Sequence, residues 1–550
     1  MNRLNNIRLC NLSKGKGNVS LSFQFQNDCA EISIQFHEPI ILNELSLEIE
    51  FGCPIVKWRN HNYTWVDCNS DRMANYYSPK ILMLNDSIKV VAGSTDGIWH
   101  YNKKQNSKLY WSLAEPLENP LFQYGENDIR NFFQVGREFK DTLTLKLFFT
   151  KNGVMEWSRS MVPFSGILCF TDHCDFDTLV LLRKQRELFD QNQIKVTKGF
   201  FQYHFSKRAD NTSFEKPEER EEYLNWIKDG HELAYHSLSQ SKKTDNQPFD
   251  DFNKFGLPDE NIVTWIDHGY QPYNFTQIEK HVGNYSAQEW VKHVKSKGIK
   301  YLWNYLDSGE SSLSLINQIS PDNFTYGTAI KGIKHHLLAK RISERIRIYL
   351  FYYSDEKTLL KYRGLSSLVK NFKSKKQIKD LIQIVATMIS LSGKITSALF
   401  PRLDVRLKKP DFARDAPCIF EIFPETENAI TFFQTLAVKD FVHTFSSVNL
   451  ETLSKEGGLC IAHTYFAFLE SHHYGKMFLN PNGDMSAEIK ETFKNIGQSI
   501  KHKQVWNPTF KELAEYFEKF RHIEYEFDKD INVLRIKVKP EIETIPMRII

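Results

Sequence analysis

Acidic and imidazole side chains gather in one short segment, where Asp172, His173, Asp175 and Asp177 lie within six residues. Three carboxylates and an imidazole are unfavourable to bury together unless they bind a cation or share protons. Asp177 has a simpler explanation, because it could cap the helix predicted to start at residue 178. Capping does not explain Asp172 or His173, so the segment predicts a metal or acid–base site.

Four more polar clusters follow along the chain, over residues 230–237, 267–273, 303–308 and 457–463. His236 and His463 each end an apolar run, and a neutral imidazole is a suitable ligand for zinc and related ions. A lone histidine is more often structural, and His231 is interpreted as a packing or capping residue. The Gly-His-Glu that precedes the strand of His236 and the serine that follows it favour a ligand role for His236.

Every one of these clusters lies at the end of a short apolar run typical of a buried strand. Strands are predicted over 167–170, 194–201, 233–235, 262–266, 301–303 and 459–462, and helices over 178–191 and 216–229. Strands and helices in alternation predict a parallel sheet with helical crossovers, either an α/β barrel or an open sheet. Because sites form where parallel strands end, we expect the five clusters to share one pocket.

The N-terminal part of the chain has a different periodicity. Val19, Leu21 and Phe23 alternate with polar residues, and so do Ile32 and Ile34. A period of two places apolar side chains on one face of a half-buried strand. With turn signals between such runs, the pattern predicts an antiparallel β domain, a sandwich.

The C-terminal part combines one more helix with alternating strands. Thr509 and Glu512 match a capping box for the last helix, and strands are predicted over 523–527 and 533–538. The predicted organisation is a β domain at 1–155, a barrel at 156–525 with an insertion at about 310–425, and a β tail at 526–550.

The insertion is distinguished by its charge. Residues 331–415 hold 20 basic and 7 acidic residues, a net charge of +13, while the rest of the chain has 51 and 60, a net charge of −9. The runs 346–353 and 381–400 inside it are apolar, although 381–400 is a poor transmembrane candidate because of Lys394 and its many polar residues. A basic, amphipathic helical insertion predicts contact with an anionic membrane surface. The alternative is that its apolar face packs on the barrel while the charges are solvated.

Composition narrows the function classes further. The 550 residues have a net charge of +4, which gives no case for a nucleic-acid-binding protein. Eight cysteines without a C-x-x-C pair argue against a disulfide framework and favour a reducing compartment. No apolar segment of a secretory signal is visible at the N-terminus, so we expect a cytoplasmic protein, membrane-associated if the insertion binds lipid.

With these clusters, residues 163–525 resemble the polysaccharide deacetylases of carbohydrate esterase family 4, the NodB-homology fold. The segment Gly230-His-Glu-Leu-Ala-Tyr-His236-Ser-Leu-Ser-Gln240 is similar to the family motif G-H-E-I-x-x-H-S/T-x-x-H. The strand ending at His463 looks like the family's L-x-H strand, and 505–517 look like its closing helix. The resemblance implies a deformed (β/α) barrel, a divalent metal ion, with zinc the expected one, and hydrolysis of a carbon–nitrogen bond in an N-acetylated carbohydrate.

The same resemblance implies roles for individual residues. Asp172 is assigned as the general base, with Asp175 as the alternative, and His463 as the general acid. The metal ligands are drawn from His173, Asp175, His236 and His268, the last replacing the family histidine that is Gln240 here. Substrate contacts are assigned to Tyr273, Trp303 and Asp307.

Three departures from the family pattern keep other interpretations open. The first motif is the variant Thr171-Asp-His-Cys-Asp175, Gln240 replaces a ligand, and the arginine of the third motif is absent. One alternative is a catalytically dead carbohydrate-binding protein. Another is a membrane-surface scaffold of glycan assembly.

Overall fold

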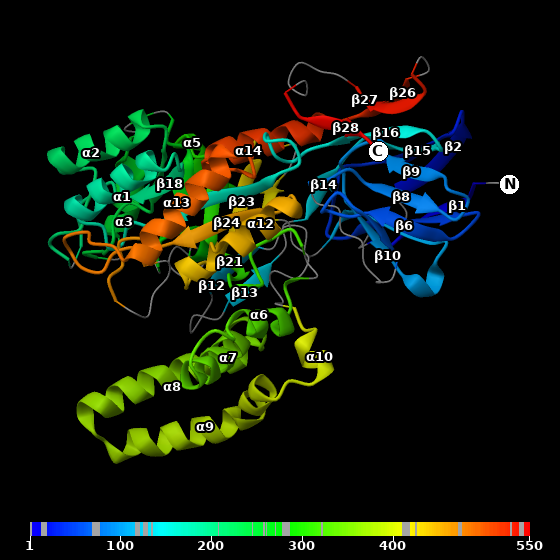
Figure 1. Ribbon diagram of the computed structural model, residues 1–550. Helices are drawn as coiled ribbons and strands as arrows, with labels where there is room; N and C mark the ends of the chain where they lie inside the picture. The colour runs from blue at the N-terminus through cyan, green and yellow to red at the C-terminus, as the bar shows by residue number, and fades with distance from the viewer. Residues whose placement is uncertain are drawn as a thin grey trace.

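The chain forms an N-terminal β domain, a parallel barrel and a helical arm that projects from the barrel (Figure 1). The computed structural model describes residues 3–12, 19–68, 77–115, 121–124, 130–133, 136–206, 208–244, 246–256, 259, 261–269, 271–277, 287–320, 323–409, 418–423, 426–470, 476–528, 531–537 and 544–550.

The N-terminal domain is built from antiparallel sheets, as the alternating pattern predicts. One sheet has the order β2-β3-β15-β9-β8-β6-β7 and the other β1-β5-β11-β10, and they enclose one apolar core. Their strands are β1 (Leu4–Cys10), β2 (Val19–Gln26), β3 (Cys29–Phe36), β5 (Leu45–Phe51), β6 (Ile55–Arg59), β7 (Trp65–Asp67), β8 (Ile81–Leu84), β9 (Lys89–Ala92), β10 (Ile98–Tyr101), β11 (Lys108–Ala114) and β15 (Thr142–Thr150). Two short pairs flank them, β4 (Ile40–Leu42) with β14 (Arg137–Phe139), and β12 (Leu121–Tyr124) with β13 (Arg130–Phe133).

Seven parallel strands close into a barrel, which decides between the two predicted α/β architectures. In order around the ring they are β18 (Val196–Phe200), β19 (Glu232–His236), β20 (Thr264–Ile266), β21 (Tyr301–Glu310), β23 (Ile430–Ala437), β24 (Leu459–Thr464) and β17 (Gly166–Asp172), which pairs again with β18. The short strand β22 (Ile419–Ile422) lies antiparallel beside β23, and β25 (Val505–Trp506) lies parallel to the start of β17.

Helices follow the strands and surround the ring. They are α1 (Leu179–Gln191), α2 (Pro217–Lys228), α3 (Gln247–Lys254), α5 (Ala287–Ser296), α11 (Phe441–Thr444), α12 (Ser447–Lys455), α13 (Ala487–Lys501) and α14 (Phe510–Glu518). Apolar residues on one face of each strand, such as Leu168 and Phe170 of β17, pack against these helices. The alternate residues, such as Ile167 and Cys169, belong to a second core inside the ring. The two cores follow from the two-residue side-chain period of a strand.

The helix α14 closes the ring at the amino-terminal end of its strands. Thr509 and Glu512 form the predicted capping box at its start. The carboxylate of Glu232, buried inside the ring, accepts hydrogen bonds from the backbone N–H of Lys511 at 2.9 Å and from Thr197 Oγ1 at 2.7 Å. A carboxylate at a helix N-terminus satisfies free N–H groups and complements the helix dipole.

A strand that follows the β domain and three strands of the C-terminal tail join the β domain to the barrel. The strand β16 (Gly153–Trp157) shares a sheet with β26 (Tyr525–Asp528), β27 (Val533–Ile536) and β28 (Met547–Ile549). Beside this sheet, Arg59 makes two hydrogen bonds with the buried Glu156, at 2.8 and 2.9 Å. The fully buried Arg159 donates to the carbonyl oxygen of Gly457, at the start of a barrel strand, at 2.7 Å.

The arm is inserted between β21 and β22 and is helical, as the sequence predicts. It consists of α6 (Tyr326–Gly332), α7 (Leu338–Tyr352), α8 (Glu356–Lys375), α9 (Ile378–Leu399) and α10 (Leu403–Arg406). Its inner helices are fixed to the barrel through a small apolar core that includes Leu306 and Tyr349. Arg347 of α7 also binds both carboxylate oxygens of Glu310, at 2.6 and 2.7 Å, at the end of β21.

Candidate functional site

All five predicted clusters contribute side chains at the carboxyl end of the barrel strands, and three of them supply histidines at strand ends. His173 directly follows β17, His236 ends β19, and His463 lies near the end of β24. Thr171 of β17 pairs in register with His463, so His173 and His463 lie on the same side of neighbouring strands. The ring centroid of His173 lies 4.1 Å from that of His463 and 4.5 Å from that of His236.

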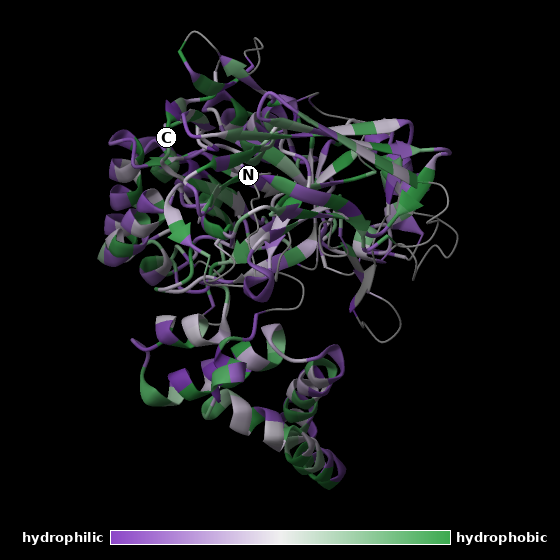
Figure 2. Ribbon diagram, turned by 90° about the vertical axis from the view of Figure 1, so that its right-hand side faces the viewer, coloured by the Kyte–Doolittle hydropathy of each residue, from purple (hydrophilic) through white to green (hydrophobic). Residues whose placement is uncertain are grey.

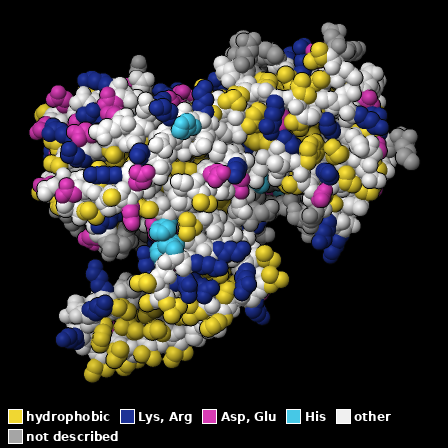
Figure 3. Space-filling model, in the orientation of Figure 1, with side chains coloured by type: hydrophobic (Ala, Val, Ile, Leu, Met, Phe, Trp, Pro, Cys, Tyr) yellow, Lys and Arg dark blue, Asp and Glu magenta, His cyan; other side chains and the backbone are white. Residues whose placement is uncertain are grey.

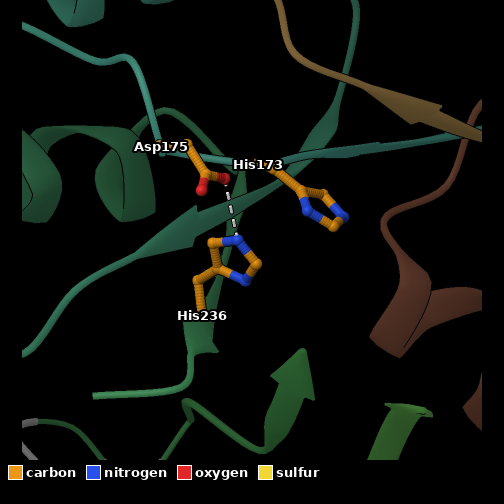
Figure 4. A group of neighbouring side chains, drawn as sticks. All are labelled: His173, Asp175 and His236. Atoms are coloured by element: carbon orange, nitrogen blue, oxygen red, sulfur yellow. Dashed lines mark hydrogen bonds and ion pairs between the residues drawn. The ribbon is translucent and has the colours of Figure 1, made fainter. Parts of the chain in front are cut away.

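Asp175 and His236 point toward each other beside His173 (Figure 4). His236 Nε2 lies 2.9 Å from Asp175 Oδ2, while His236 Nδ1 lies 3.3 Å from the carbonyl oxygen of Ile266. A neutral imidazole carries one N–H, so only one of its nitrogens can donate. If Nδ1 donates to the carbonyl, the lone pair of Nε2 faces a carboxylate oxygen, and a cation or a proton between them removes the repulsion. Ligating histidines commonly donate their second nitrogen to such a carbonyl.

The imidazole of His173 is buried with both of its ring nitrogens. The side chain is 1% exposed, and within the residues that the structure describes neither ring nitrogen has a hydrogen-bond partner. An unsatisfied buried polar group is unfavourable and calls for an explanation such as an ion. One donor atom each from His173, Asp175 and His236 lie within 4.8 Å of one another, a spacing that a metal ion could bridge.

The electrostatics of the three side chains suit a cation. Burial lowers the pKa of His236 to about 4, and burial followed by the neighbouring His463 holds the pKa of His173 well below its usual range. Burial alone would raise the pKa of Asp175, but His268 and His236 hold it well below its usual range. At neutral pH the group therefore presents two neutral imidazoles and one carboxylate, the protonation states that metal binding requires.

His268, predicted as the replacement ligand, lies at the same site. Its Nε2 is 2.5 Å from Asp175 Oδ1, so it shares that carboxylate with His236. Gln240, in the position of the family histidine, donates from Nε2 to the backbone oxygen of Asp175 at 2.9 Å. Gln240 thus supports the backbone of the proposed ligand Asp175.

On the other side of His173, His463 is paired with a carboxylate. His463 Nδ1 lies 3.0 Å from Asp307 Oδ1, which also accepts a hydrogen bond from Thr435 Oγ1 at 2.7 Å. A carboxylate on one imidazole nitrogen fixes the orientation of the ring. Asp307, predicted as a substrate contact, is placed here as the partner of His463.

Asp172 is not part of this group, and its assignment as general base is not supported by its position. It lies on the outer face of β17, where Lys198 Nζ contacts its Oδ2 at 2.5 Å and contacts Asp177 Oδ2 at 2.6 Å. Its other oxygen accepts from Thr464 Oγ1 and from the backbone N–H of Phe466, both at 2.9 Å. Burial raises the pKa of Asp172 to about 6. Asp177 also binds Lys198 in this buried cluster of charges. The helix α1 is capped by Thr178, and not by Asp177 as the sequence predicted.

Two predicted substrate contacts lie in the protein interior. Tyr273 is 1% exposed, its hydroxyl accepts from the backbone N–H of Leu238 at 2.8 Å, and its ring packs on Phe252. Trp303 is buried against the rings of His173 and His463, each with a centroid distance of 4.9 Å. Trp303 therefore packs against the two histidines. The rings of Tyr273 and Trp303 are both buried, so neither has an exposed face on which a sugar could stack.

Tyr465 and Thr435 belong to the site but were not anticipated from the sequence. The ring of Tyr465 lies 4.8 Å from that of His173, and Thr435 binds Asp307. A signal for Tyr465 existed, because it follows His463 by two residues, whereas nothing in the sequence pairs Thr435 with Asp307.

A second group of side chains with ligand spacing lies where the arm meets the barrel, formed by His335, Asp440 and His443. The rings of His335 and His443 are stacked at 3.7 Å, and each contacts Asp440, at 3.3 and 2.9 Å. This group is partly exposed, in contrast to the buried group in the barrel.

Comparisons with known proteins do not identify the chain. No family model and no curated protein matches it. Among solved structures, a GH31 dextranase mutant of Flavobacterium johnsoniae with isomaltotriose is 7% identical with a TM-score of 0.21 over 55% of this chain and 47% of that chain. The same dextranase with glucose is 6% identical, with a TM-score of 0.28 over 94% and 73%. The galactosidase domain of an alpha-galactosidase-sucrose kinase is 9% identical, with a TM-score of 0.19 over 96% and 74%.

The chain thus spans less than half the length of the first of these structures. TM-scores of this size do not indicate a shared fold, so the site is interpreted from its own geometry.

Proposed function

We propose that the chain is a metal-dependent hydrolase of carbon–nitrogen bonds that removes the acetyl group from an N-acetylated sugar, in a polymer or a sugar precursor. The observation that carries this proposal is the buried group of His173, Asp175 and His236, in which the two ring nitrogens of His173 have no hydrogen-bond partner among the described residues. The similarity of 230–240 to a deacetylase motif supports the choice of reaction, because His236 of that motif is a member of the group.

The donor set fits a divalent cation such as zinc. Two imidazole nitrogens and one carboxylate oxygen match catalytic zinc sites, which keep a further position for water. His173, Asp175 and His236 would hold the ion, and His268 would orient Asp175 through its other oxygen. A bound ion of this kind lowers the pKa of its water and polarises the amide carbonyl.

His463 is the proton-transfer group in this proposal. Hydrolysis adds water to the carbonyl carbon and breaks the C–N bond, so water loses a proton and the leaving nitrogen gains one. Asp172 faces away from the site and Asp175 is engaged by two imidazoles, which leaves His463 to carry out both transfers. Asp307 acts through His463 as a positioning residue, because its Oδ1 contacts His463 Nδ1 and fixes the orientation of the ring.

Acetate release tests the proposal. The full chain, loaded with zinc, is expected to release acetate from N-acetylated oligosaccharides or nucleotide sugars, and chelation is expected to abolish release. His173→Ala should be inactive, while His502→Ala, which changes an exposed histidine outside the site, should keep full activity. A zinc-loaded chain that binds these sugars and releases no acetate would support the carbohydrate-binding alternative.

A further inference from the structure

The outermost helix of the arm, α9, exposes a continuous apolar stripe. Ile378, Ile382, Val385 and Ile389 are spaced by four, three and four residues, and the three isoleucines are 64–74% exposed. Residues at this spacing lie on one face of a helix. Leu381 and Met388 widen the stripe. Soluble proteins seldom expose so many large apolar side chains together unless the surface has a binding partner.

The arm does not bury this stripe on the barrel. Hydrophobic side chains gather along its outer edge in Figure 3, whereas the inner helix α7 contributes Ile348 and Leu350 to the core at the barrel. Hydrophobic and hydrophilic residues alternate along the helices of the arm (Figure 2). The alternative that the insertion packs on the barrel therefore holds for α7, whereas the stripe of α9 is exposed.

Exposed cations accompany the stripe. Lys370, Lys373, Lys375, Lys376 and Lys379 are exposed around the turn that joins α8 to α9. They belong to the segment 331–415 with its net charge of +13. Figure 3 shows Lys and Arg side chains at the end of the arm and on its side toward the barrel.

We propose that the arm docks on an anionic lipid bilayer, with the α9 stripe in the interfacial layer and the lysines on the headgroups. Apolar residues flanked by lysines fit a bilayer surface, which has an apolar acyl-chain layer beneath negatively charged headgroups. A second copy of this chain fits poorly, because it would bring two segments of +13 together.

A spanning orientation fits less well than an interfacial one. In the described part of the chain, α9 is the helix long and apolar enough to cross a bilayer. However, α8 packs along it, with Lys394 of α9 bound to Asp355 at the start of α8 at 3.1 Å. Spanning would draw the exposed Lys361 and Lys370 of α8 into hydrocarbon, which is strongly unfavourable.

Co-sedimentation of the full chain with vesicles tests the proposal. Binding is expected to vesicles of phosphatidylserine and phosphatidylcholine at low salt, with weaker binding to phosphatidylcholine alone and in high salt. The double variant Ile382→Ser/Ile389→Ser should bind anionic vesicles about tenfold or more weakly, because two side chains no longer enter the apolar layer.

A matched variant separates the stripe from general surface hydrophobicity. Val448→Ser/Leu479→Ser removes two exposed apolar side chains outside the arm and should bind as the unaltered chain does. Equal binding to neutral and anionic vesicles at low salt, or unchanged binding of the isoleucine variant, would overturn the proposal. The proposal would also be overturned if the unaltered chain forms a dimer and does not bind vesicles, and the isoleucine variant is monomeric. The stripe would then bind a second copy of the chain.

Discussion

Replacing His463 with alanine is expected to leave the metal bound and to lower the rate of deacetylation by about 100- to 10,000-fold, the usual contribution of one general acid–base residue. The reason is geometric: His463 is paired with Asp307 at 3.0 Å, whereas His173, Asp175 and His236 form the group with ligand spacing. Metal content and the rate of acetate release are measured on the same preparation. The metal content tests whether the ion is retained, and the rate tests whether turnover is lost.

Two further variants define the role of His463. Asp307→Asn should lower the rate less than His463→Ala and should shift the pH profile, because it alters the partner of Nδ1 and keeps the imidazole. If His463→Ala loses the metal, His463 is a ligand, and His268 becomes the next candidate for proton transfer. If His463→Ala is fully active, the proton-transfer role proposed for His463 is wrong.

Replacing Lys198 with methionine is expected to destabilise the barrel by about 3–5 kcal/mol, the usual effect of removing one partner of a buried ion pair. Lys198, Asp172 and Asp177 are fully buried, so the loss of the ammonium leaves two carboxylates without their cation. The urea midpoint of the full chain, followed by tryptophan fluorescence, measures the effect.

Lys195 offers a matched control three residues away. Its ion pair with Glu512 is partly exposed on both sides, and Lys195→Met should change stability by about 1 kcal/mol or less. The triple variant Asp172→Asn/Lys198→Met/Asp177→Asn, which removes all three charges, should recover part of the loss. Equal midpoints for the Lys198 and Lys195 variants would contradict a structural role for the buried pair.

The position of Asp172 differs from the one that the role implied by the resemblance requires, and simple periodicity predicts that position. Ile167, Cys169 and Thr171 alternate with Leu168 and Phe170, and the first set lies inside the barrel. Continuing the alternation places His173 inside and Asp172 outside, against the helices. The alternation in β17 therefore predicts that Asp172 and His173 lie on opposite faces of the strand. Which face is the inner one is known only from the closed barrel.

Local signals in the sequence were reliable predictors of elements. The capping box of Thr509 and Glu512 forms as predicted, because its hydrogen bonds join residues three apart. The strands near 167, 233, 301 and 459 are present, with β21 extending to Glu310, well beyond the predicted end at residue 303. Tyr273, in contrast, follows a strand in a polar loop and is still buried, because Phe252 and Trp265 cover it.

Long-range pairs in the site were beyond the reach of the sequence. Asp175 meets His268 across 93 residues, and Asp307 meets His463 across 156. The strand ends predicted that such residues share a pocket, but the partner of each depends on barrel closure and on the orientation of the loops. For the same reason the sequence predicted a basic, amphipathic insertion, while the exposed α9 stripe is visible only in the structure.

Anomalous diffraction at the zinc absorption edge, from a crystal of the full chain grown with zinc, tests whether His173, Asp175 and His236 hold a metal ion. A peak is expected between His173, Asp175 and His236, about 2.0–2.1 Å from one nitrogen of each imidazole. The group of His335, Asp440 and His443 lies elsewhere in the structure, so a peak there would be distinguished by its position from a peak in the barrel. An electron density map with ordered side chains and no anomalous peak at His236 would contradict the metal site and the hydrolytic function proposed from it.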